Sequence, residues 1–187
     1  MSCLLTNGRE EVCKTAVGGI DAIYFINYGE MDVITYDATN TDSIETVTGV
    51  ISLFKYELKG TNSFEQTITS SRENGTTFVE QTLTFTIKNL TEATHKQMKL
   101  LSFGRPHVLV QTRNNQFFLA GLEHGMDVTT GLIANGTAMG DLSGYTMTMV
   151  GQENLAANFC EVVVTPGNQV TDAQLEAVFT AASIVKV

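Results

Sequence analysis

The sequence predicts a mainly β protein: an antiparallel β-sandwich or β-barrel with a long protruding hairpin and one or two covering helices. Threonine occurs 26 times in 187 residues, and its branched side chain suits a strand that has one face in water. Proline occurs only twice, whereas glycine occurs 16 times, a composition that supplies turns without interrupting strands. Apolar and polar side chains alternate with a two-residue period in several segments, as half-buried strands require.

The clearest element is a long hairpin with its turn at Asn74-Gly75, a pair that tolerates the positive φ angles of a tight turn. Alternation persists through Phe78–Lys88, and Phe64, Gln66 and Ile68 alternate with polar residues upstream. Thirteen residues from Thr76 to Lys88 span roughly 43 Å at about 3.3 Å each. A domain of this length is about 40 Å across. The hairpin therefore either crosses the whole domain or protrudes from it.

The remaining chain is expected to bring the total to about nine strands and two helices. A loop that we expect to be mobile occupies Gly131–Gly140, which contains three glycines. Shorter strands are expected at Ala22–Asn27, Met31–Tyr36, Val50–Leu58, His107–Thr112, Gln116–Ala120, Met126–Thr130, Gly144–Val150 and Phe159–Thr165.

Two helices follow from capping signals. Thr91 is a suitable N-cap for a helix over Glu92–Leu101, in which Lys96 and Lys99 occupy the later turns where positive charge is favoured. A capping box that begins at Thr171 predicts a second helix over Asp172–Ala181.

The organisation that we expect is one domain over residues 1–187. It comprises an N-terminal arm (1–20), the hairpin region (50–88) and a C-terminal helix and tail (166–187). Apolar residues make up 43% of the chain and charged residues 17%, which favours a packed core over disorder. No stretch of 18 uninterrupted apolar residues and no secretory signal pattern occurs, so we expect no membrane association.

Charge is unevenly distributed along the chain. The formal net charge is −9, and it divides into −6 over residues 1–54, +3 over 55–113 and −6 over 114–187. A chain without a cluster of bases binds nucleic acid poorly, although an acidic surface lets DNA lie nearby without adhering. A basic middle flanked by acidic ends suggests charge complementarity, either inside the fold or between copies.

No catalytic, metal or cofactor constellation is found in the sequence, so we expect a protein that is not an enzyme and needs no cofactor. Cys160 belongs to an apolar run and is expected to be a buried thiol, whereas Cys3 and Cys13 either pair or remain inert. The three histidines are too scattered to form a metal site by spacing; they are His95, His107 and His124.

Over about residues 20–165 the pattern resembles the tail tube subunits of bacteriophages. The resemblance rests on Ile51–Leu58 (ISLFKYEL), the turn Arg72–Thr76 (RENGT), the helix that follows, and Gln116–Gly121 (QFFLAG). A further stretch, Gly136–Tyr145 (GTAMGDLSGY), is similar to sequences common in virion proteins of phages that infect Bacteroidetes.

The resemblance implies a hexameric ring, stacked on identical rings into a tube through which DNA leaves the virion without specific binding. The inner sheet of such a ring is built jointly by strands of all subunits, so that no edge stays open. The implied location is the virion tail, with synthesis in the host cytoplasm, and the implied partners are further copies and other tail or baseplate proteins.

On this hypothesis, the subunit interface uses the hairpin arm and the helix after it. Glu65 and Glu80 are the only acids on the polar faces of the hairpin, and either they line the channel or the acids of residues 21–45 and 123–161 do. The candidate interface residues are Phe64, Ile68, Asn74, Gly75, Phe78, Lys96 and Lys99.

Other functions remain alternatives. Another ring-forming tail protein or a head–tail joining protein would share these features. A monomeric β-sandwich that binds a glycan or other ligand is a different class, but the chain has no tryptophan, and such modules rely on exposed aromatic rings. An enzyme is the least favoured, because no acid–base or metal constellation is found.

Overall fold

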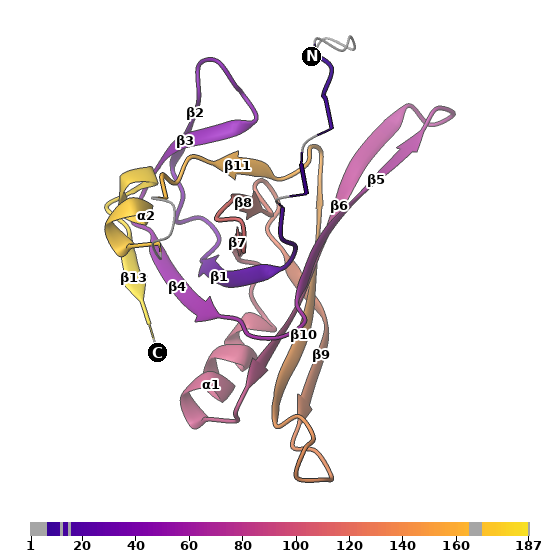
Figure 1. The fold of residues 1–187 in the computed structure, drawn as a ribbon, viewed down its shortest axis with the longest axis vertical. Coiled ribbons are helices and arrows are strands. Elements are labelled where there is room, and N and C mark those ends of the chain that lie inside the picture. Colours follow the sequence, from indigo (N-terminus) through magenta and orange to yellow (C-terminus); the bar gives the residue numbers. More distant parts are fainter. Residues whose placement is uncertain (1–6, 12, 15, 165–169, 187) are drawn as a thin grey trace.

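The computed structural model of the chain describes residues 7–11, 13–14, 16–164 and 170–186, and every structural statement below refers to these residues. It contains two β-sheets and two helices, so the predicted mainly β fold is confirmed. Figure 1 shows the smaller sheet as a long, narrow layer along one side of the molecule. The larger sheet and both helices lie on the opposite side of the molecule.

The larger sheet, sheet A, has nine strands in the order β12-β3-β11-β8-β7-β1-β4-β13, with β2 paired to β3. Three of its pairings are parallel, namely β11 with β3, β12 with β3 and β13 with β4. Its strands are β1 (Ile20–Ile26), β2 (Val33–Tyr36), β3 (Ser43–Thr48), β4 (Ser52–Glu57), β7 (His107–Thr112), β8 (Phe117–Ala120), β11 (Asn158–Cys160), β12 (Phe179–Thr180) and β13 (Ser183–Val185).

The smaller sheet, sheet B, is antiparallel throughout and has the strand order β5-β6-β10-β9. Its two central strands are the longest in the structure, so it extends beyond the area that sheet A covers (Figure 1). Its strands are β5 (Ser63–Ser71), β6 (Thr76–Lys88), β9 (Asp127–Ala134) and β10 (Gly144–Glu153).

Two hydrophobic cores hold the fold together, one on each face of sheet A. Between the sheets, Leu83 and Phe85 of β6 pack with Ile23 of β1 and Val110 of β7. The second core lies under helix α2 (Asp172–Val178) and the strands that flank it. Strand β1 is buried at six of its seven positions, because one of its faces points into each core. Each fully buried large aliphatic side chain stabilises the fold by about 1.5–3 kcal/mol.

The predicted hairpin is confirmed, together with its alternation. Strand β6 begins at Thr76 and ends at Lys88, and its inward side chains are buried at Val79, Gln81, Leu83 and Phe85. Strand β5 pairs with it from Ser63 opposite Thr84 to Ser71 opposite Thr76. The base of the hairpin therefore packs on the core, whereas its tip extends beyond the rest of the molecule (Figure 1).

Helix α1 covers Glu92–Leu101, as predicted. The Thr91 hydroxyl accepts a hydrogen bond from the Thr94 N–H at 3.2 Å, which satisfies one of the free amides of the first turn. Met98 points into the core between the sheets. Neither helix of the described residues has the length and apolar character needed to cross a membrane.

The predicted strand count was too low: thirteen strands lie in the described residues. The prediction of a loop over Gly131–Gly140 was wrong for its first four residues, because β9 continues to Ala134 and pairs with β10. Strand β3 was not predicted, and neither were β12 and β13. All three take part in the parallel pairings of sheet A, which join segments far apart in sequence and leave no local pattern. Strand β3 also forms an antiparallel pair with its neighbour β2.

Two predicted boundaries were also wrong. The strand expected over Phe159–Thr165 ends at Cys160, and Thr165 lies outside the described residues. The second helix begins at Asp172, as predicted, but it ends at Val178 rather than Ala181. It ends early because Phe179–Thr180 forms a parallel pairing with β3.

Candidate assembly surface

Sheet B has one face on the core and one face that points away from it. Strand partners in register share a face, and successive residues alternate between faces, so the pairing identifies the outward side chains. We call this surface the open face; all of its residues are exposed or half-buried. Its members include Glu65, Thr67 and Thr69 of β5, Phe78, Glu80, Thr82, Thr84 and Thr86 of β6, Thr146, Thr148, Val150 and Gln152 of β10, and Asp127, Thr130 and Leu132 of β9.

Threonines form a ladder across the centre of the open face. The Thr84 and Thr148 hydroxyls lie 3.3 Å apart, and so do those of Thr86 and Thr146. Near the hairpin end, the Gln152 side-chain amide donates to Glu80 at 3.4 Å. These contacts provide hydrogen-bond partners for polar side chains within the sheet. None of the residues that make them is a lysine or an arginine, so this part of the face is polar but not positively charged.

The charges on the open face are mostly negative. Glu65, Glu80 and Asp127 are its acids, and Lys88 at the end of β6 is its one base among the described residues. Glu65 and Glu80 therefore lie on one surface, and Asp127 joins them from β9. Such a face gives little attachment for the phosphates of a nucleic acid, which bind to clustered Lys and Arg.

Both outer edges of sheet B are unpaired in the described part of the chain. Strand β5 pairs only with β6, and β9 pairs only with β10. An unpaired edge presents a row of backbone N–H and C=O groups that can pair with another chain. Each edge also carries exposed apolar side chains: Ile68 on β5 is 69% exposed, and Leu132 and Ile133 on β9 are 57% and 49% exposed.

The predicted interface residues lie at three places in the structure. Ile68, Asn74 and Gly75 lie on the protruding part of the hairpin, and Phe78 lies beside them on the open face. Phe64 instead packs toward the core, where its ring centre is 6.2 Å from that of Phe118. The other two, Lys96 and Lys99, are exposed on α1, at the opposite end of the molecule from the hairpin tip (Figure 1).

A strand was predicted over Met126–Thr130, and Asp127 was among the alternative channel acids of residues 123–161, but the extension of β9 to Ala134 and its position at a sheet edge were not predicted. The alternation of β9 is interrupted by a register shift opposite Thr148 and Met149, which hides its period. Gly131 lies within the strand, where an added Cβ would be 3.0 Å from the Met147 sulfur. Close packing explains this glycine, whereas from sequence alone a glycine favours a loop.

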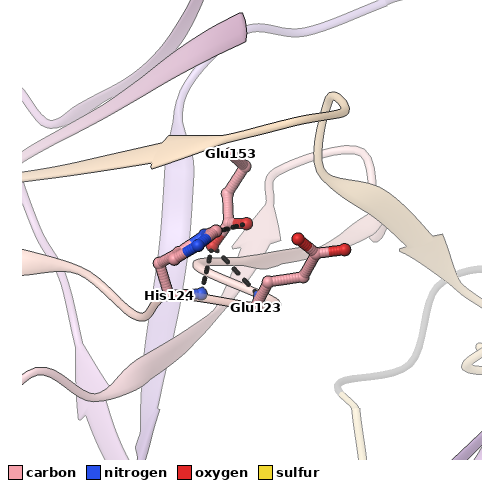
Figure 2. A group of neighbouring side chains, drawn as sticks. All are labelled: Glu123, His124 and Glu153. Carbon is pink, nitrogen blue, oxygen red and sulfur yellow. Dashed lines mark hydrogen bonds and ion pairs between the residues drawn. The ribbon is translucent and has the colours of Figure 1, made fainter.

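The loop that leads into β9, residues 121–125, is held by the buried carboxylate of Glu153. One Glu153 oxygen accepts the backbone N–H groups of Glu123 and His124 at 3.1 and 2.8 Å, and the other lies 3.2 Å from His124 Nδ1 (Figure 2). Glutamate and histidine are common metal ligands, and the ligand atoms of the three side chains lie within 4.8 Å of one another. Because the chain's own donors already occupy the Glu153 carboxylate, the cluster acts here as a clamp on the loop.

Two further buried polar side chains hold the same loop. Gln81 accepts the Gly121 N–H at 2.8 Å, and the ring of His107 bonds the Gly121 carbonyl through Nδ1. Burial lowers the pKa of His107 below the usual value of histidine, and its hydrogen bond to Gly121 offsets only part of this effect. His107 is therefore a neutral structural residue.

An apolar cavity of about 410 Å³ lies between α1 and sheet A. Phe25 and Tyr56 form part of its wall, with their ring centres 5.4 Å apart in an edge-to-face arrangement. At its rim the Arg105 guanidinium lies 4.0 Å from the centre of the Tyr28 ring. The cavity has room for a small apolar group or side chain.

Cys160 is buried, as predicted, and burial raises the pKa of its thiol to about 12. Such a thiol is not a nucleophile at neutral pH. Cys3 lies outside the described residues, so the alternatives for Cys3 and Cys13 stay open.

Comparisons of the chain with protein-family models, with curated proteins and with solved structures find no match.

Proposed function

We propose that the chain is a phage virion structural protein, a tail tube subunit that self-assembles into hexameric rings. The observation that carries this proposal is a four-stranded sheet with two unpaired edges, one core face and one polar face. Ring closure places β5 of one copy beside β9 of the next. In the order β5-β6-β10-β9 every neighbour is antiparallel, so β5 and β9 run in opposite directions. Their pairing continues the antiparallel alternation around the ring and removes both edges.

The dimensions of such a ring favour six copies. Strands about 4.8 Å apart and tilted by about 40° each occupy roughly 6.3 Å of circumference. Six copies of four strands then form a barrel about 48 Å across between backbones, whereas four copies give about 32 Å. After side chains are allowed for on both walls, the larger barrel has room for a DNA duplex and the smaller one has little to spare.

The open face is suited to line the bore of this barrel. The core face of sheet B is occupied by sheet A, so the open face must point inward. The hydroxyl groups of its threonines bind water at the surface of the bore, and the carboxylates of Glu65, Glu80 and Asp127 repel the phosphates of DNA. A weakly acidic wall lets DNA slide past without pausing, which is the property that a conduit needs.

A monomeric binding module is the second candidate function. The cavity between α1 and sheet A favours it, because aromatic walls and a few polar groups at the rim are typical of small-ligand sites. This candidate leaves the two free edges of sheet B unexplained.

The proposal is tested by concentrating the purified chain and examining it by light scattering and negative-stain microscopy. We expect rings with a central hole, a mass of six times 20.3 kDa for the single ring, and tubes at higher concentration. Rings that never stack would favour a head–tail joining protein. A monomer at every concentration would contradict the proposal and favour the binding module.

A single substitution tests the role of the sheet edge. Ile68→Lys places a charge on the exposed β5 edge, and edge charges oppose strand pairing. We expect it to abolish ring formation while the circular dichroism spectrum and the melting temperature stay close to those of the unaltered chain. Val50→Lys is the matched control, since Val50 is 86% exposed and lies in the turn before β4. Rings formed equally by both variants would show that the β5 edge is not the interface.

A further inference from the structure

The end of the molecule that carries the hairpin tip is acidic. In Figure 1 the turn between β2 and β3, strand β11 and the tip of the β5–β6 hairpin lie at the upper end of the long axis. Acids outnumber bases in and beside these segments. Asp37 and Asp42 lie in the turn, Glu73 lies at the hairpin tip, Glu45 lies in β3 and Glu161 follows β11, whereas the base is Arg72. The described part of the N-terminal arm lies at the same end and adds two acids and two bases, namely Glu10, Glu11, Arg9 and Lys14.

The opposite end is basic. Strand β6 ends there, and α1 follows it (Figure 1). The segment from Lys88 to Arg105 contains four bases and one acid, and all five side chains are exposed. The loop between β9 and β10 lies at the same end (Figure 1) and adds one exposed acid, Asp141, which lines a depression together with Lys88. The bases of these segments therefore outnumber the acids by four to two. Lys96 and Lys99 are three positions apart on α1, so they lie on the same face of the helix.

Neither set of charges is neutralised within the chain. Of the described residues, the ion pairs are Lys55 with Glu57, His124 with Glu153, and Lys186 with Asp172, and these include none of the charged residues named at either end. Two unit charges 4 Å apart interact by about 1 kcal/mol in water and by more where water is partly excluded. A surface with several unpaired acids and another with several unpaired bases therefore attract each other when copies meet end to end.

The acidic end also offers a groove. A depression of about 390 Å³ lies between the β2–β3 turn and the loop into β9, and its wall includes Asp42, Glu123 and Glu153. No lysine or arginine is among the described residues that line it. Asp42 and Glu123 are exposed at its rim, whereas the Glu153 carboxylate lies below and binds the loop. The negatively charged rim can therefore bind a positively charged surface that protrudes from another molecule.

We propose that copies of this chain associate head to tail along the long axis, with Lys96 and Lys99 of one copy at the Asp42–Glu123 rim of another. The inference rests on the proposed ring, and it assigns the contact by which one ring binds the next. Head-to-head stacking would instead place the acids of two copies together. A contact between two different surfaces repeats without closing, so it builds a tube of unlimited length with one polarity.

Charge reversal at each end tests this contact. Lys96→Glu with Lys99→Glu, and separately Asp42→Lys with Glu123→Lys, should each leave single rings and abolish tubes. Sedimentation velocity distinguishes rings from tubes, and negative-stain microscopy shows them directly. The control Lys96→Arg with Lys99→Arg keeps the charge and should stack normally. All four positions are exposed, and thermal melts establish that each variant is folded.

The decisive variant carries all four reversals in one chain. It exchanges the charges of the two ends, so we expect it to form tubes again. Tubes of normal length in either two-site variant would overturn the head-to-tail contact and leave the ring proposal standing. Failure of the four-site variant to stack would overturn the pairing of these particular residues. An unaltered chain that stays monomeric would overturn the ring proposal and this inference together.

Discussion

Three buried polar side chains fix the loop that leads into the edge strand β9. Gln81 and His107 bind Gly121, and Glu153 binds the amides of residues 123 and 124. A buried hydrogen-bond acceptor that loses its donor costs about 1–3 kcal/mol, so each of these contacts holds the loop in one position. The start of β9, and with it one edge of the proposed ring contact, depends on them.

His107 should make the stability of the protein depend on pH. Burial lowers its pKa in the folded state below the value near 6.5 that it has when unfolded. The unfolded chain therefore takes up a proton first as the pH falls, and the stability contributed by neutral His107 is present above pH 6.5 and is lost below it. We expect the urea midpoint to fall between pH 7.5 and pH 5.5.

The variant His107→Gln isolates this effect, because every other group titrates in both proteins. The urea concentration at which this variant is half unfolded should be lower than that of the unaltered chain at pH 7.5, and it should change less with pH. Equal pH dependence in the two proteins would show that protonation of His107 does not destabilise the fold.

At the scale of the element, the β5–β6 hairpin depends on the conformation of its turn. Gly75 has a φ of 65°, and an added Cβ there would meet no atom within 4 Å. The position therefore needs a residue that tolerates the left-handed region, although it has space for any side chain.

Gly75→Val should destabilise the hairpin tip by about 1–2 kcal/mol, because β-branched residues avoid the left-handed region. Hydrogen exchange should accelerate at the tip amides and stay unchanged in α1, and ring formation should weaken. Gly75→Asn is the matched control, since asparagine tolerates this conformation. If valine and asparagine behaved alike, turn geometry would not limit the hairpin.

The hairpin and α1 were predictable because their signals are local. The alternation over Phe78–Lys88 and the cap at Thr91 each lie within a few residues of the structure that they specify. Strand β3 was not predicted: it pairs with the neighbouring β2, but its other partners, β11 and β12, come more than one hundred residues later. The Glu153 clamp is similar, because His124 and Glu153 are 29 residues apart and meet only after β9 and β10 have paired.

At the scale of the whole molecule, the proposed assembly uses two different kinds of contact. Ring closure would use backbone hydrogen bonds and apolar side chains at the edges of sheet B, which salt affects little. Stacking would use the opposite charges of the two ends, which salt screens over a Debye length of about 3 Å at 1 M.

We therefore expect tubes to separate into rings as sodium chloride is raised to 1 M, while the rings persist. Light scattering follows the loss of tubes, and sedimentation velocity identifies the species that remains. Removing the salt by dialysis should restore the tubes. Rings that dissociate before the tubes do, or tubes that are unchanged in 1 M salt, would contradict this division of contacts.

The sequence by itself determined that this protein is mainly β, where its long hairpin and first helix lie, and that its middle third is basic between two acidic thirds. These properties follow from neighbouring residues or from composition, so no knowledge of the fold is needed. Only the tertiary structure decided that sheet B has two free edges and an acidic open face, and that the charges separate to opposite ends of the long axis. Each of these depends on which distant segments pair, and pairing is settled by the packing of the whole chain around its two cores.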